Sequence, residues 1–220
     1  MSTKFHILYE FKSGPWGGGN QFLKALRNAM LEKNVYTDSA ENADVILFNS
    51  HHFGENLEQL KFLIELKQSK PNLRLMHRLD GPISLIRGGS RSIDNLIFQI
   101  NSKLADGTIF QTNWSKEQSE RIGLNTRHLN QIITNAPDTT IFSPATKKKS
   151  PNPIIKLINT SWAMNKRKGL DILHHLDDAL DFSRFEMTFV GNTKSQFKNI
   201  QTLPPPVSYT HLTLPTIYSV

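Results

Sequence analysis

Short apolar runs of strand length alternate along this chain with longer segments whose apolar residues recur at helical spacing. The first such unit has a strand-like run at 5–9, a glycine-rich loop at 13–20 and a helical segment at 22–31. Strands that alternate with helices form a parallel sheet covered by helices on both faces. The sequence therefore predicts the α/β class, with ligands bound beyond the carboxyl ends of the strands.

The same alternation continues through the rest of the chain. Further strands are expected at 45–48, 73–76, 107–110, 131–134, 154–158 and 185–190, and further helices at 57–66, 93–104, 115–122 (capped by Ser115) and 168–180. Prolines around a lysine run interrupt the pattern at 144–153. We therefore predict an N-terminal Rossmann-like domain at 1–143, a linker at 144–153, and the first part of a second Rossmann-like domain at 154–207.

The C-terminal segment 208–220 differs in composition from the rest of the chain. It contains no Lys, Arg, Asp or Glu and follows the prolines at 204–206. It resembles the translated read-through of a sequencing adapter, so we interpret it as a non-native tail. Only about two strands are expected before it in the second domain, too few to bury both faces of a sheet. We therefore expect a chain truncated within its second domain.

The composition narrows the classes of partner and chemistry. The chain has 220 residues and a formal net charge of +7, which favours nucleotides, nucleic acids or an anionic membrane surface as partners. It contains no cysteine, which excludes disulfides, thiolate metal sites and thiol nucleophiles. We identify neither a signal peptide nor an apolar stretch of about 18 residues, and therefore expect a cytoplasmic protein.

A glycine run at Gly17, Gly18 and Gly19, followed by Asn20, lies between the first predicted strand and helix. Backbone N–H groups at such a helix start can approach a phosphate without obstruction from side chains. A flexible turn is the alternative interpretation. Neither the G-x-G-x-x-G fingerprint nor a Walker sequence is present, which argues against NAD binding and P-loop ATPase activity.

Two further motifs place charged groups where loops are expected. His77, Arg78 and Asp80 combine a base, a guanidinium and a carboxylate in the loop predicted after the strand at 73–76. The alternative is a turn capped by Asp80 and a structural ion pair from Arg78. Arg167 and Lys168 stand at a predicted helix start, where cations are unfavourable unless an anion is bound, or they belong to a solvated charge run.

The sequence offers little support for a metal site or for nucleic-acid binding. The adjacent histidines at 51–52 and 174–175 point in different directions on a helix or strand, and no Asp-x-Asp pair occurs. Aromatic residues do not interleave with basic residues as they do on nucleic-acid-binding surfaces. We therefore expect no metal, no cofactor and no nucleic-acid partner.

The order of these motifs resembles that of GT-B glycosyltransferases of the large retaining family four, also called group 1, and particularly of a bacterial subgroup. The similarity covers roughly residues 4 to 206. The matching segments are 17–20, 77–82, 106–112, 114–115, 133–138, 142–144, 161–162, 165, 167–169 and 189–192. The resemblance implies two Rossmann-like domains that face a cleft, with the acceptor held by the N-terminal domain and the donor by the C-terminal domain.

The resemblance also implies an activity and a set of site residues. A metal-independent, retaining transferase would move a sugar from a nucleoside-diphosphate sugar to a glycan or lipid acceptor in cell-surface polysaccharide synthesis, with peripheral contact to the inner membrane face. Asp80, with His77 or Arg78, would line the reaction centre. The donor would be bound by Gly17, Gly18, Gly19, Asn20, Ser161, Arg167 and Lys168.

The chain departs from this family in one motif. The two glutamates, separated by seven residues, that grip the sugar and ribose have no counterpart here. We therefore expect the fragment to be inactive alone. Two other functions remain open at this point: a non-catalytic module that binds a phosphorylated ligand or a partner protein, and a nucleotide-sugar epimerase of GT-B fold.

Overall fold

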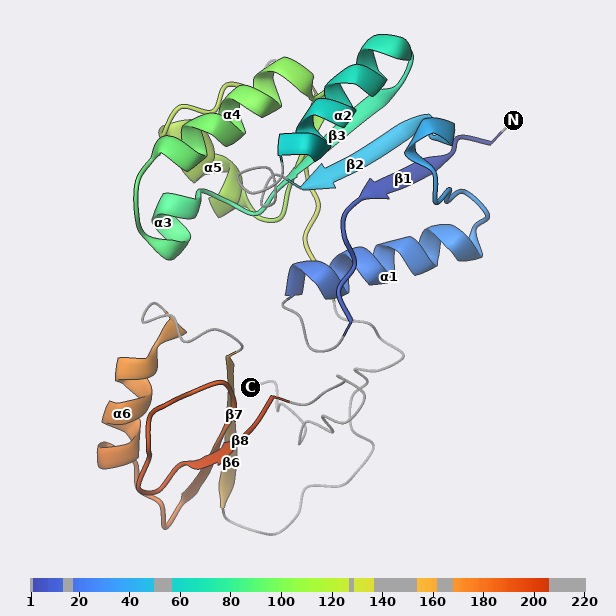
Figure 1. Cartoon of the computed structure of the whole chain (residues 1–220). Helices are drawn as coiled ribbons and strands as arrows, with labels where there is room; N and C mark the ends of the chain where they lie inside the picture. The colour runs from blue at the N-terminus through green and yellow to red at the C-terminus, as the bar shows by residue number, and fades with distance from the viewer. Residues whose placement is uncertain are drawn as a thin grey trace. The chain divides into compact units, whose positions relative to one another are not determined.

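Two compact units make up the chain, which is seen here in a computed structural model (Figure 1). The first unit contains residues 1–11 and 18–135, and the second contains residues 12–17 and 136–220. The structure describes residues 2–13, 18–49, 57–126, 129–136, 154–161 and 168–205. The predicted linker at 144–153 and the predicted tail at 208–220 lie outside these ranges.

The first unit is built on a five-stranded sheet whose strands are all parallel and follow the order β1-β2-β3-β4-β5. The strands are β1 (Phe5–Leu8), β2 (Val45–Asn49), β3 (Arg74–Leu79), β4 (Gly107–Phe110) and β5 (Leu129–Ile132). The helices are α1 (Gly18–Glu32), α2 (Leu57–Ser69), α3 (Ile83–Arg87), α4 (Ser92–Leu104) and α5 (Asn113–Arg121), with a short 3-10 helix η1 (Ala40–Asn42) before β2.

A single bridge on the outer side of β1 shows that the sheet is doubly wound. Tyr36 pairs with Phe5 in parallel, since the Phe5 N–H donates to Val35 O at 2.8 Å and the Thr37 N–H donates to Phe5 O at 2.9 Å. The chain therefore passes first to one side of β1 and then to β2 on the other side. Figure 1 shows α1 on one face of the sheet and α2 and α4 on the opposite face. Ligands of doubly wound sheets bind at the carboxyl ends of the strands.

Alternating residues of the strands fill two cores on the two faces of this sheet. Ile7, Leu47, Met76 and Ile109 pack toward Leu23 and its neighbours on α1. The next residue of each strand points the other way because side chains alternate across a sheet. The opposite core gathers Leu8, Ile46, Phe48 and Leu75 with residues of α2 and α4, among them Leu63 and Ile100.

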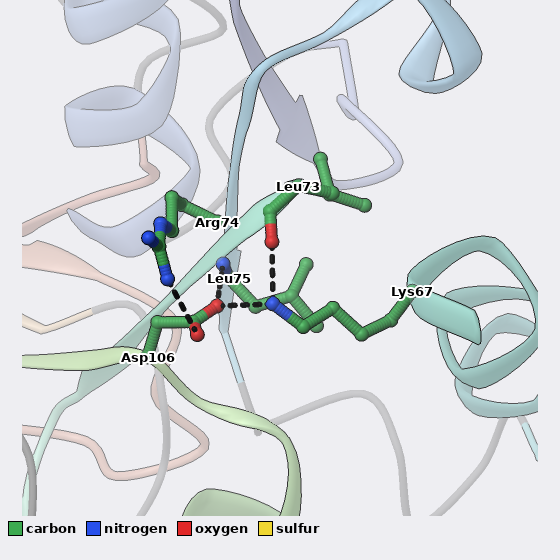
Figure 2. Close-up of polar contacts among 5 residues, drawn as sticks. All are labelled: Lys67, Leu73, Arg74, Leu75 and Asp106. Atoms are coloured by element: carbon green, nitrogen blue, oxygen red, sulfur yellow. Dashed lines mark hydrogen bonds and ion pairs between the residues drawn. The ribbon is translucent and has the colours of Figure 1, made fainter. Parts of the chain in front are cut away.

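Asp106, which directly precedes β4, ties together the amino edge of the sheet (Figure 2). Its carboxylate accepts hydrogen bonds from Lys67 Nζ and the Leu75 N–H, both at 2.8 Å, and Arg74 Nη1 lies 3.4 Å away. Lys67 Nζ also donates to Leu73 O at 2.5 Å. The contacts join α2, β3 and β4 at the edge opposite to the expected ligand site.

The charge state of Asp106 follows from these contacts. Burial alone would raise the pKa of Asp106, but the hydrogen bonds from Lys67 and Leu75 and the nearby charges outweigh burial, so that its pKa lies below the ordinary value. The Asp106 carboxylate is therefore a structural group within the sequence motif at 106–112.

The second unit has a parallel sheet of three strands in the order β6-β7-β8. It consists of β6 (Ile155–Ser161), α6 (Leu170–Ala179), β7 (Phe185–Gly191) and β8 (Gln201–Leu203). Its core contains Leu173 of α6, Met187 and Phe189 of β7, and Ile200 just before β8. The expectation of about two strands is wrong by one, because β8 is short and all its residues are exposed, which leaves no apolar pattern in the sequence.

Asp177 of α6 fixes the chain that leads into β8. Its buried carboxylate accepts the backbone N–H groups of Lys198, Asn199 and Ile200 at 2.6, 2.8 and 2.9 Å. Burial acts to raise the pKa of Asp177, but these three hydrogen bonds lower it below its ordinary value. The carboxylate thus satisfies three donors that would otherwise lose their partners on burial.

Several predicted boundaries need correction. β3 runs to Leu79 instead of ending near residue 76, so that His77 and Arg78 belong to the strand and not to the loop. α5 begins at Asn113 and is capped by Thr112, whose Oγ1 accepts the Ser115 N–H at 3.0 Å. Ser115 is therefore not the cap. In the part of the chain that the structure describes, no helix is long and apolar enough to cross a membrane.

Candidate functional site

Four polar side chains form a closed ring at the carboxyl edge of the first sheet. Arg78 lies near the end of β3, Asp80 follows β3, Gln111 follows β4, and Asn135 lies shortly after β5. Arg78 Nη1 donates to Asp80 Oδ1 at 2.5 Å, and Gln111 Nε2 donates to the same oxygen. Asn135 Nδ2 donates to Gln111 Oε1 at 2.9 Å, and Arg78 Nη2 closes the ring with a contact of 3.4 Å to Asn135 Oδ1.

The Arg78 guanidinium is the buried member of this polar ring. The residue is 2% exposed, whereas the side chain of Asp80 is 35% exposed. Arg78 points to the α1 face of the sheet, where its Cζ lies 4.4 Å from the centroid of the Phe22 ring. Burial lowers the pKa of Arg78, and the charge and hydrogen bond of Asp80 oppose that shift. The Asp80 carboxylate is therefore accessible to a ligand, while the buried Arg78 guanidinium holds that carboxylate in place from the sheet side.

His77 does not join this ring, although it is the neighbour of Arg78 in the sequence. Side chains alternate across the sheet, so His77 points to the opposite face and is completely buried there. Its ring stacks on Phe48 with centroids 4.4 Å apart, and its Nδ1 lies 3.0 Å from Asn101 Nδ2. Asn101 also donates to Thr108 Oγ1 at 2.7 Å. His77 is a core residue beneath α4.

Gly81 sets the direction of the chain just after Asp80. Its φ is +120°, a conformation that side chains rarely adopt. A Cβ at this position would lie 3.1 Å from both Ile86 Cδ1 and Trp114 Cζ3. Glycine at this position is therefore required by backbone conformation and by packing together, and it keeps Asp80 at the strand end.

The glycine run opens α1, as the sequence predicts for Gly18 and Gly19, whereas Gly17 lies outside the described residues. A Cβ at Gly18 or Gly19 would meet no described atom within 4 Å. Packing among the described residues therefore does not explain the glycines. Asn20 is 3% exposed and lies in the first turn of α1.

In the second unit the predicted donor residues lie around the start of α6 and the end of β6. Ser161 is the last residue of β6, and Lys168 is exposed just before Gly169, the N-cap of α6. Arg167 lies outside the described residues. Gly191 of β7 packs directly against Ser161, since a Cβ there would lie 2.8 Å from the Ser161 carbonyl carbon.

Each unit also has a cavity that could hold a ligand, of about 650 Å³ in the first unit and about 610 Å³ in the second. The second cavity lies at the carboxyl ends of β7 and β8 and is lined by Gly191, Asn192, Thr193, Lys194, Thr202, Pro204 and Pro205. Lys194, Thr193 and Thr202 carry no role in the sequence prediction. Within the ranges that the structure covers, no group of three or more His, Asp or Glu side chains is arranged to hold a metal ion.

Two members of the polar ring, Gln111 and Asn135, also have no assigned role in the sequence prediction, although both lie in its motifs. Their signal in the sequence is their place directly or shortly after a predicted strand. Polar residues at such positions converge on one edge when the strands are parallel. The partnership with Asp80 itself depends on the strand order, which the sequence does not specify.

The architecture defines an α/β protein of GT-B type, with Rossmann-like parallel sheets in both units, and this confirms the predicted fold class. No protein-family model matches the sequence, and no curated protein matches it. Among solved structures, the chain is similar to Anabaena Alr3699/HepE in complex with UDP-glucose, with 13% identity and a TM-score of 0.63. That match covers 93% of this chain and 70% of the other.

Two further solved structures share the fold at a similarly low sequence identity. One is a trehalose-6-phosphate protein from E. coli bound with UDP-2-fluoro glucose, with 13% identity, a TM-score of 0.51, and coverage of 87% of this chain and 54% of that one. The other is trehalose-6-phosphate synthase OtsA, with 12% identity, a TM-score of 0.50, and coverage of 87% and 53%. The chain thus spans about half the length of these two proteins.

Proposed function

We propose that this chain is a glycosyltransferase, or a part of one, that moves a sugar from a nucleoside-diphosphate sugar to a glycan or lipid acceptor. One observation carries the proposal: 93% of the chain shares its fold with a protein solved in complex with UDP-glucose. The polar residues at the strand ends of each unit add support, because ligands of parallel sheets bind there.

In the second unit, Ser161, Lys168 and Arg167 are the proposed donor-binding residues. A nucleoside diphosphate leaves with growing negative charge, and fixed cations at a helix start can stabilise that charge. Lys168 is exposed and directly precedes the N-cap of α6, which suits contact with a phosphate. We propose that these groups replace a metal ion in stabilising the leaving group.

In the first unit, Asp80 is the proposed catalytic residue and Arg78 its positioning partner. Asp80 is partly exposed and accepts hydrogen bonds from Arg78 and Gln111, which fix its carboxylate at the strand end. A carboxylate there can accept the proton of an attacking acceptor hydroxyl. The burial of His77 supports a role in the core beneath this site and not contact with substrate.

The glycine run at 17–19 and Asn20 are proposed to bind a phosphate group. A Cβ at Gly18 or Gly19 would meet no atom of the described residues within 4 Å, and the backbone N–H groups at the start of α1 carry partial positive charge. Retention of anomeric configuration, membership of family four, a place in cell-surface polysaccharide synthesis, and cytoplasmic action with peripheral membrane contact belong to the same proposal. The first three and the membrane contact rest on the motifs of the sequence, and the cytoplasmic location rests on the sequence features described above for the chain's apolar runs.

Calorimetric titration of the full chain with UDP-glucose and with UDP tests the proposal. Lys168→Ala should weaken UDP binding about tenfold, because one charge-assisted hydrogen bond is lost. Lys156→Ala is the matched control, since Lys156 pairs with Glu186 at 3.2 Å near the opposite end of β6. Its UDP affinity should not change. Equal UDP binding by the unaltered chain and the Lys168→Ala variant would argue for a binding module of another kind.

A further inference from the structure

The 650 Å³ cavity of the first unit lies beside β1 and includes none of the residues proposed for donor binding or catalysis. It extends from the carboxyl end of β1 along its outer side to Tyr36, next to α1. The lining residues are His6, Ile7, Leu8, Tyr9, Glu10, Phe11, Lys24, Arg27, Asn28, Tyr36, Asp38 and Gln59.

Aromatic rings and one guanidinium dominate the lining of this β1 cavity. Arg27 Cζ lies 5.7 Å from the centroid of Phe11 and 5.1 Å from that of Tyr36, so one cation is in contact with both rings. Tyr9 meets Phe11 edge to face, with centroids 5.3 Å apart at 71°. His6 stacks on Tyr36 at 6.1 Å. The cavity thus presents several ring surfaces within a small space.

The charges of the β1 cavity balance one another. Two cations, Lys24 and Arg27, face two carboxylates, Glu10 and Asp38. Arg27 Nη2 donates to Asp38 Oδ1 at 2.7 Å, and hydrogen bonds with Asp38 and Tyr36 raise the pKa of Arg27. Arg27 is thus engaged by a carboxylate and is poorly placed to hold a phosphate. A neutral ligand with hydrogen-bonding groups fits this balance better than an anion does.

The shape and polarity of the lining argue against two other ligand classes. An acyl chain would desolvate the charged side chains that line the cavity, which costs free energy. An extended peptide needs several free backbone groups on the outer edge of β1. The bridge between Phe5 and Tyr36 already occupies the outward backbone groups of Phe5. The N–H and C=O groups of successive residues alternate between the two neighbouring strands, so Ile7 is the one other residue of β1 whose backbone groups point to the outer edge.

We infer that the β1 cavity binds a neutral saccharide, and that this saccharide is the part of a glycan acceptor distant from the reacting hydroxyl. A pyranose presents an apolar C–H face that packs on the electron-rich face of an aromatic ring, and hydroxyls that pair with polar side chains at its rim. The cavity reaches the carboxyl end of β1, and Asp80 follows β3. β1 and β3 flank β2, so these two strand ends are about 10 Å apart, a span of about two sugar units. The role as acceptor subsite rests on the proposed glycosyl transfer.

The experiment titrates the full chain with cellohexaose, maltohexaose and glucose by calorimetry, and with UDP-glucose in parallel. At least one hexasaccharide should bind, and glucose should bind much more weakly. Phe11→Leu and Tyr36→Leu should each weaken hexasaccharide binding about tenfold, since each loses an aromatic face but keeps apolar volume. Phe185→Leu at the start of β7 is the matched control and should bind the hexasaccharide as the unaltered chain does.

The outcomes separate this inference from the proposed function. Absence of hexasaccharide binding, or unchanged binding by both aromatic variants, would overturn the inference. The inference would also be overturned if an extended Val–Thr peptide bound the chain, lost affinity in the Phe11→Leu and Tyr36→Leu variants, and the saccharides did not bind. UDP-glucose binding should be equal in the unaltered chain and both variants. Hexasaccharide binding in a chain that binds no UDP-glucose would keep the saccharide site and refute the proposed transferase.

Discussion

Replacement of Asp80 by alanine should destabilise the first unit more than replacement of its partner Arg78 by methionine. Arg78 is 2% exposed, so loss of Asp80 leaves a buried guanidinium without its carboxylate. Removal of one partner of a buried ion pair costs about 3–5 kcal/mol, and we expect about 3 kcal/mol here because water can reach the side of Asp80. The side chain of Asp80 is 35% exposed.

The opposite replacement should cost less. With Arg78→Met, the Asp80 carboxylate keeps the hydrogen bond from Gln111 and gains water, while methionine fills much of the space of the arginine stem. We expect a loss of about 1.5–2 kcal/mol, in the lower part of the range of about 1.5–3 kcal/mol for hydrogen bonds to a charged group. The double variant should then be more stable than Asp80→Ala alone, because the unpaired charge is gone.

Urea denaturation followed by circular dichroism measures these free energies of unfolding. Amide hydrogen exchange of peptides from β3 and β4 assigns the transition to the first unit. If Arg78→Met is the more destabilising replacement, or if the two effects add in the double variant, the guanidinium is not a buried charge that depends on Asp80. The double-mutant cycle isolates this dependence from unrelated effects of each substitution.

Three further outcomes test the structural part of the description. The pKa of Asp106 is lowered in the folded state, so the ionised carboxylate should stabilise the fold above pH 3.8, the ordinary pKa, and this stabilisation should be lost as the pH falls below 3.8. The free energy of unfolding of the Asp106→Asn variant should therefore depend less on pH below 3.8 than that of the unaltered chain. Gly191→Ala should lower the melting temperature of the second unit, because the new methyl group meets the backbone of Ser161, at a cost of about 1–3 kcal/mol in the free energy of unfolding. Gly18→Ala is the control and should be neutral or stabilising in the same calorimetric scan. Asp177→Ala should increase hydrogen exchange in the segment before β8, since three N–H groups lose their acceptor, and unchanged exchange there would contradict the anchoring role.

The alternation of strands and helices could be predicted from the sequence because β1, β2, β4 and the first part of β3 contain short groups of apolar residues between segments of helical spacing. The length of β3 could not, since His77 and Arg78 are polar and look like loop residues in isolation. His77 is accommodated by Phe48 and Asn101, and Arg78 by Asp80 and Phe22. Those partners come from other elements, and only the folded sheet brings them next to the strand.

The candidate site shows the same division between local and long-range information. Asp80 could be predicted from the Gly-Pro turn that follows it, because a breaker after an apolar run marks a strand end. Gln111 and Asn135 could be located at strand ends, but not as partners of Asp80, because that pairing needs β3, β4 and β5 to be neighbours in this order. The cavity beside β1 gave no signal in the sequence, since its rings come from segments that meet only through the bridge at Tyr36.

Arg78 also connects two motifs that the sequence presents as independent. Its Nη1 holds Asp80, and the face of its guanidinium lies on Phe22, one turn after the glycines that open α1. Strand alternation is the reason, because it turns Arg78 toward α1 and His77 away from it. If the start of α1 moves, Phe22 moves with it and changes its contact with the buried Arg78 guanidinium, which in turn holds the Asp80 carboxylate. Since a shift of α1 would take the Phe22 ring away from the buried Arg78 guanidinium and lose this cation–π contact, the start of α1 and the carboxyl end of β3 are expected to keep one mutual position while substrate binds to either.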